Sequence, residues 1–145
     1  MSENAYSVAN ELLKVAADAL LESHGGVPDR RFVAMGFPVP DVPDQLTVYL
    51  SNVTPSATFS AGLVQGYEYG YSVVLTRAYP AQPGDAGVIP ADVIDMASRI
   101  LYEDLDLLVH HFLCVFPYEA TLGSISAIDP LGGVAGWTIP LSITA

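Results

Sequence analysis

The pattern of apolar and polar residues predicts two helices. Over residues 7–23, apolar side chains recur at helical spacing and charged side chains occupy the opposite face, which is typical of an amphipathic helix. Gly25 and Gly26 follow this segment, and glycine readily adopts the left-handed conformation that ends a helix. His24 lies in the last predicted turn, where a cation would complement the helix dipole.

The second predicted helix covers residues 91–116. Pro90 suits its first turn and Pro117 ends it. One apolar stripe runs along its whole length and predicts a face packed on the rest of the domain. The stripe consists of Val93, Ile94, Ala97, Ile100, Leu101, Leu105, Leu108, Phe112 and Val115.

Between and after these helices, short β-branched, aromatic or alternating segments predict strands. The predicted strands are residues 31–37, 45–53, 67–79, 119–128 and 135–144, and residues 57–64 form either a strand or a loop. The proline-rich segments 38–44 and 81–90 predict extended connections. The order α-β-β-β-α-β-β therefore predicts one α+β domain over residues 1–145. Its mainly antiparallel sheet has five or six strands, with both helices packed on it.

The composition differs from that of an ordinary monomer. Charged residues make up 14% of the chain, against about 25% in a typical soluble domain, and the mean hydropathy is +0.39. A surface so poor in charge favours coverage by partners, although a neutral Ser/Thr/Gly surface on a monomer would also fit. The single cysteine, Cys114, excludes an internal disulfide, and its apolar helical neighbours predict a buried, inert thiol.

The charges that are present are mostly acidic. Sixteen acids against five bases give a net charge of −11, and the bases are scattered along the chain. Nucleic acids and anionic membranes are bound by clustered Lys and Arg, so neither is an expected partner. The longest uncharged stretch contains polar residues and proline throughout, which predicts a soluble protein in a cytoplasm. An acidic wall would, however, repel a passing DNA duplex and keep it from adhering.

A search for reactive groups yields one weak metal candidate. Asp106 and His110 are four residues apart on the second helix and share a face, whereas His111 points about 100° away. The simpler interpretation places His110 in solvent and His111 at the border of the core. Paired carboxylates at Glu103–Asp104, Asp92/Asp95 and Asp41/Asp44 are interpreted as solvated charges. The sequence therefore predicts no catalytic residue, no cofactor and no metal ligand.

Aromatic residues provide the candidate interface. Tyr67, Tyr69 and Tyr71 point to one face of their predicted strand and fit a core or an interface equally well. Trp137 also fits either a core or an interface, since tryptophan is common at interface centres. Pro140 indicates that the last strand lies at an edge of the sheet, where another subunit could dock. The candidate interface comprises Tyr67, Tyr69, Tyr71, Trp137, Ile139 and Leu141.

The order and length of these segments resemble the tail-terminator and neck proteins of long-tailed bacteriophages. The resemblance covers nearly the whole chain, from SVANELLKVAADALLES through RFVAMGF, QLTVYLSNV and YEYGYSVVLTRAY to ADVIDMASRILYEDLDLLVHHF and GWTIPLSITA. It implies a sheet flanked by two helices and a ring, usually of six subunits, that caps the tail tube and joins it to the neck. The implied partners are further copies of the chain, the tube protein and a neck or stopper protein. DNA would pass the lumen without specific binding.

The same resemblance implies a virion protein that assembles in the bacterial host cytoplasm and has no catalytic residues. Three alternatives remain open on the sequence. The chain could be another oligomeric structural or adaptor protein, such as a head-tail stopper. It could also be a small metal-assisted hydrolase that uses Asp106 and His110, or a ligand-binding domain.

Overall fold

A computed structural model describes residues 4–37, 42–55, 67–80, 89–130 and 133–144. Its elements are α1 (Ala5–Leu20), β1 (Arg30–Ala34), β2 (Gln45–Pro55), β3 (Tyr67–Ala78), α2 (Ala91–Cys114), β4 (Glu119–Leu122), β5 (Ser126–Ile128) and β6 (Val134–Thr144). This order confirms the predicted α+β fold. The segment 57–64 and most of the predicted loop 81–90 lie outside the described residues.

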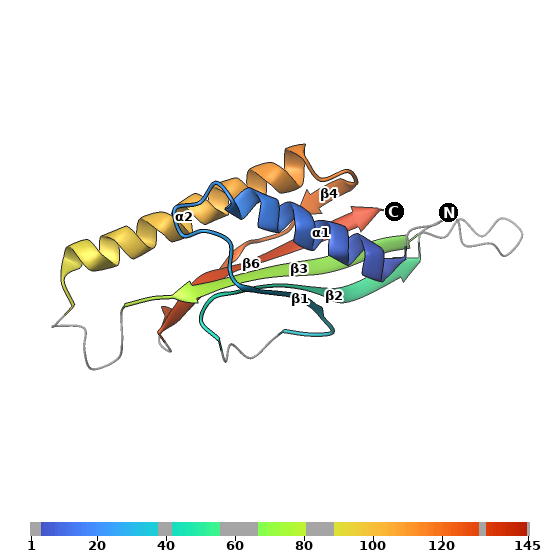
Figure 1. The fold of residues 1–145 in the computed structure, drawn as a ribbon. Helices are drawn as coiled ribbons and strands as arrows, with labels where there is room; N and C mark the ends of the chain where they lie inside the picture. The colour runs from blue at the N-terminus through green and yellow to red at the C-terminus, as the bar shows by residue number, and fades with distance from the viewer. Residues whose placement is uncertain (1–3, 38–41, 56–66, 81–88, 131–132, 145) are drawn as a thin grey trace, which may run out of the picture.

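The strands form one sheet in the order β1-β2-β3-β6-β4, with β5 also paired to the outer edge of β6. β1 pairs with β2 in parallel, and the other pairings are antiparallel, so the predicted mainly antiparallel sheet is confirmed. Figure 1 shows α1 and α2 side by side on the same face of the sheet. The core therefore lies between this face and the two helices.

Helix α1 begins directly after its N-cap residue, Asn4. The side chain of Asn4 accepts a hydrogen bond from the backbone N–H of Ser7 at 2.8 Å. The Ser7 hydroxyl in turn accepts one from the backbone N–H of Asn4 at 3.2 Å. This capping box satisfies amide donors that the first helical turn leaves unpaired. The apolar face of α1 then packs on β2 and β3, where Leu12 and Leu46 are completely buried.

The prediction that β6 is an edge strand is wrong. β6 pairs with β3 on one side and with β4 and β5 on the other. The missing amide donor of Pro140 is tolerated because β4 and β5 are interrupted opposite it. There, Gly123 N–H donates to the Pro140 carbonyl at 2.8 Å. The predicted strand 119–128 is correspondingly two short strands rather than one.

Candidate functional site

Four residues of the candidate interface belong to the core. Tyr69, Tyr71, Ile139 and Leu141 are at most 6% exposed and face α1 and α2. The Tyr71 hydroxyl donates to the Ala5 carbonyl at 2.7 Å, and burial raises the pKa of this phenol. These side chains are buried and stabilise the fold, so the interface prediction is corrected at these positions.

The other two residues of the candidate interface remain at the surface. Tyr67 is 42% exposed and stacks on Tyr69 with ring centroids 6.0 Å apart. Trp137 is half-buried, and its indole N–H donates to the Leu101 carbonyl at 2.8 Å. The centroid of the Tyr102 ring lies 5.9 Å from that of the Trp137 ring, and Tyr102 is mostly exposed. Trp137 and Tyr102 line a surface hollow of about 240 Å³ beside β5.

A buried ion pair lies beneath the α1–β1 connection. The Arg77 guanidinium of β3 donates to both carboxylate oxygens of Asp104 of α2, through Nε at 2.6 Å and Nη2 at 3.2 Å. The Ser23 hydroxyl donates to the same carboxylate at 2.5 Å. The guanidinium also donates to the Gly25 carbonyl at 3.0 Å and the Gly26 carbonyl at 2.6 Å.

This network is structural. Asp104 is completely buried and Arg77 nearly so. Their polar atoms are engaged by one another, by the Ser23 hydroxyl and by backbone carbonyls, which leaves no access for a substrate. The prediction that Asp104 is a solvated charge is therefore wrong. Adjacent helical residues point about 100° apart, so Asp104 faces inward while Glu103 faces the α1–β1 connection.

Glu103 binds His24. The His24 backbone N–H donates to the Glu103 carboxylate at 2.6 Å, and the His24 ring Nδ1 lies 2.9 Å from it. These hydrogen bonds lower the pKa of Glu103, the backbone bond contributing most. His24 lies beyond the end of α1 and pairs with α2, so its predicted role at the α1 dipole is corrected.

The hydrolase candidates lie at the surface of α2. Asp106 and His110 are exposed, and the His111 ring is hydrogen-bonded to the Leu107 carbonyl at 3.0 Å. Within the described residues, no group of three or more His, Cys, Asp or Glu side chains is placed to hold a metal ion. Cys114 is exposed rather than buried, because it lies two residues beyond buried Phe112 and so points away from the core. Its Sγ lies 3.8 Å from the His110 ring.

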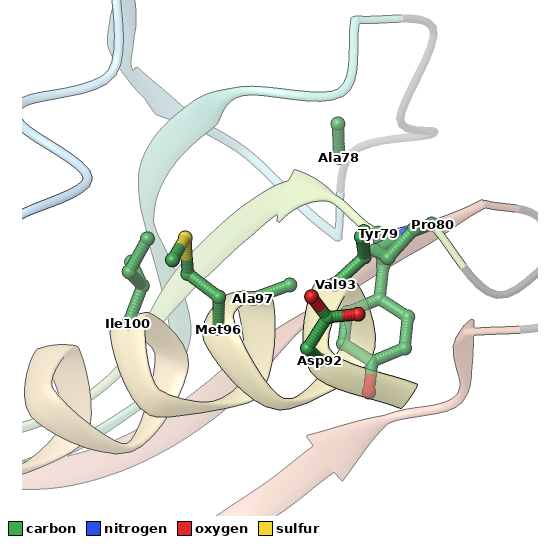
Figure 2. A pocket seen from close by; sticks show the side chains of 8 residues that line it. All are labelled: Ala78, Tyr79, Pro80, Asp92, Val93, Met96, Ala97 and Ile100. Atoms are coloured by element: carbon green, nitrogen blue, oxygen red, sulfur yellow. The ribbon is translucent and has the colours of Figure 1, made fainter. Parts of the chain in front are cut away.

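Part of the exposed apolar surface is gathered in three places. One is the first half of α2, where Val93 and Met96 are 45% and 67% exposed. These residues and the end of β3 enclose an open, mostly apolar pocket of about 520 Å³, whose eight lining residues are shown in Figure 2. Among the described residues that line it, the polar side chains are those of Tyr79 and Asp92.

A second apolar surface, here called the α1–β1 groove, lies beside β1. Met35 is 91% exposed and Tyr6 67% exposed, and together with Val33 and Leu50 they border a groove of about 180 Å³. A third apolar surface is the end of α2, where Leu113 and Val115 are more than half exposed. Large apolar side chains that gather on the surface of a domain are candidates for contact with a partner.

Comparisons with protein-family models and with curated proteins found no match to this sequence. Among the helices of the described residues, none has both the length and the apolar character that crossing a membrane requires.

Proposed function

We propose that this protein is a non-enzymatic structural subunit that assembles with copies of itself into a ring. The ring is of the kind that caps the tail tube of a long-tailed bacteriophage and joins it to the neck. Its partners would then be the neighbouring subunits, the tube protein and a neck or stopper protein, and DNA would pass its lumen. The observation that carries this proposal is the exposure of large apolar side chains on a chain with few charges.

The supporting argument is one of free energy. Exposed apolar surface costs roughly 25 cal/mol per Å² relative to its buried state. The three apolar surfaces lie at the two ends of α2 and beside β1, so a single partner bound at one of them would leave the others in water. A ring subunit has two lateral and two axial contacts, and so it can cover surfaces on several sides. The fold also agrees with the sheet and two helices that the resemblance implies.

The first test is the molar mass in solution, measured by light scattering over a concentration series. A mass of several subunits that stays constant over a range of concentrations supports a closed ring. A second measurement uses Met35→Lys, which places a charge in the α1–β1 groove without touching the core. We expect Met35→Lys to reduce the assembled mass while the melting temperature is unchanged. Thr54→Lys, which adds the same charge at an exposed position of β2, is the matched control.

The hydrolase alternative differs from the proposal in what it predicts for metal binding by α2. If Asp106 and His110 held a metal, His110→Ala would abolish metal binding and leave assembly intact. In a structural subunit, His110→Ala changes neither the mass nor the stability. Calorimetric titration with Zn²⁺ therefore separates the two functions, and stoichiometric binding lost in His110→Ala would overturn the proposal.

A further inference from the structure

Four polar side-chain atoms of β2 and β3 are buried and lack a hydrogen-bond partner in the part of the chain that the structure describes. They are the Gln45 Oε1 and Nε2, the Thr47 Oγ1 and the Thr76 Oγ1. Gln45 and Thr47 are completely buried, and Thr76 is 3% exposed. We propose that these atoms form an internal hydration site, in which at least one ordered water molecule bridges the two strands. The site lies within one subunit and does not depend on the proposed assembly.

The strand register brings the three side chains together. Gln45 is paired directly with Thr76, and Thr47 lies two residues further along β2. Directly paired residues share a face of a sheet, as do residues two apart on one strand. Leu46 and Leu75 alternate with them and are buried in the core beneath the helices. The three polar side chains therefore lie on the face of the sheet that α1 and α2 do not cover.

The backbone around these side chains is used by the sheet itself. β2 is paired with β1 on one side and with β3 on the other, and β3 is paired with β2 and β6. Gln45, Thr47 and Thr76 each have a partner residue on both neighbouring strands. Inside a sheet, the backbone N–H and C=O groups are engaged in the ladders. Partners for the three side chains must therefore come from elsewhere.

The chemistry of these side chains matches water. A threonine hydroxyl and a glutamine amide can each donate and accept hydrogen bonds, as water does. A buried polar group without a partner loses its hydration and gains nothing in return, and most such groups in proteins are bonded to the chain or to ordered water. A buried water molecule usually has two to four polar partners, and the three side chains can supply them. They carry no charge, so a neutral ligand fits better than an ion.

Neighbouring side chains on the same face are packed as well. Phe37, which follows β1, lies edge-on against Tyr49, with ring centroids 6.2 Å apart. Tyr49 is two residues beyond Thr47 on β2, and Val74, the residue paired with Thr47, is 1% exposed. A water molecule held among such buried groups would exchange with bulk solvent more slowly than surface water does, because the site must open first.

The test compares the wild type with the double variant Thr47→Val and Thr76→Val, which keeps the side-chain shapes but removes both hydroxyls. Magnetic relaxation dispersion of the solvent signal counts the water molecules that stay bound for long times. We expect the double variant to lose at least one long-lived water molecule. Thr138→Val, at a partly exposed position of β6 on the same face, is the matched control and should leave this count unchanged.

Melting temperatures of the single variants provide a second measurement, whose sign is informative. If water bridges the strands, Thr47→Val and Thr76→Val each remove a hydrogen bond, and we expect each to lower the melting temperature by a few degrees. If the hydroxyls are bonded to nothing, valine removes the cost of burying a polar group, and the melting temperature stays the same or rises.

Two outcomes overturn the inference. Single variants that melt at or above the wild-type temperature would show that the hydroxyls have no hydrogen bond to lose. Variants that melt lower while the count of long-lived water molecules stays the same would show that the side chains bond directly to one another. If the double variant does not fold, as judged by circular dichroism, Thr76→Val alone is compared with the wild type by both measurements.

Discussion

The two halves of α2 belong to one apolar stripe but have different surroundings. In the first half, Val93 is 45% exposed, and Ile94, Ala97 and Ile100 are partly exposed. In the second half, Leu101, Leu108 and Phe112 are at most 7% exposed. Figure 1 gives the reason: the yellow start of α2 projects past the end of β3, while the orange half lies over the sheet.

This difference shows what helical periodicity does and does not reveal. Spacing determines which side chains share a face of a helix, because each residue turns by about 100°. It does not determine what covers that face, which depends on where the sheet ends. The second half of α2 therefore stabilises the fold, and the first half stays largely exposed among the residues that the structure describes.

The ion pairs of the two halves differ in the same way, and the largest predicted effect comes from the buried one. Removing one partner of a buried ion pair costs about 3–5 kcal/mol because the other charge is left without a partner. We expect Asp104→Ala to lower the free energy of unfolding by about this amount in urea denaturation. Asp106→Ala, exposed on the same half of α2, is the control. Equal stability of the two variants would contradict the role assigned to Asp104.

The next effect concerns the apolar stripe itself. Leu108→Ala removes a completely buried side chain and should cost about 2–5 kcal/mol, from lost transfer free energy and the cavity left behind. Val93→Ala, in the exposed half, should change the free energy of unfolding by about 0.5 kcal/mol or less. Comparable losses in chemical denaturation would mean that the first half is also packed within the subunit.

A smaller effect, dependent on pH, is predicted for Glu103 in the second half of α2. Its folded-state pKa is lowered by the bonds to His24, so the stabilisation is present above the unfolded pKa and is lost as the pH falls through the folded pKa. Melting temperatures across acidic pH should therefore fall less steeply in Glu103→Gln than in the wild type. Glu22→Gln, an exposed carboxylate near the end of α1, serves as control. Identical acid limbs in Glu103→Gln and wild type would refute the assignment.

The smallest effect is expected in the first half. The Arg99 Nε lies 2.9 Å from the Asp95 carboxylate, but both side chains are more than half exposed. Solvent screening reduces such helical pairs to about 0.3–0.5 kcal/mol. Arg99→Ala should therefore shift the urea midpoint only slightly, and less in high salt. A loss of unfolding free energy near that of Asp104→Ala would show that side-chain exposure does not predict how much these two ion pairs stabilise the protein.

Local patterns in the sequence predicted the elements well. The alternation of Leu46, Val48 and Leu50 and the apolar spacing of α1 report short-range physics, and these elements are confirmed. The Arg77–Asp104 pair was missed because its members are 27 residues apart and each resembles an ordinary surface charge. Pro140 was misread for a related reason, since a break in the neighbouring strands cannot be seen in the sequence of β6 itself.

The candidate site was harder to predict than the fold. The spacing of Tyr67, Tyr69 and Tyr71 correctly placed them on one face, where successive rings lie 6.0 Å apart. It could not show that α1 covers Tyr69 and Tyr71, because contacts between distant segments leave no periodic signal. The order of the strands in the sheet likewise depends on pairings between distant segments, which the sequence does not specify.

The loop between α1 and β1 has no regular structure, yet three of its successive amides are engaged. The His24 N–H is bound to Glu103, the Gly25 N–H to the Ser23 hydroxyl, and the Gly26 N–H to the Ser23 carbonyl. The Arg77 guanidinium donates hydrogen bonds to the carbonyls of Gly25 and Gly26. We expect the His24 amide, whose acceptor lies on α2, to exchange with deuterium more slowly than it would without this bond. A surface loop with two glycines is thus tied to α2 and β3 by hydrogen bonds rather than by regular structure.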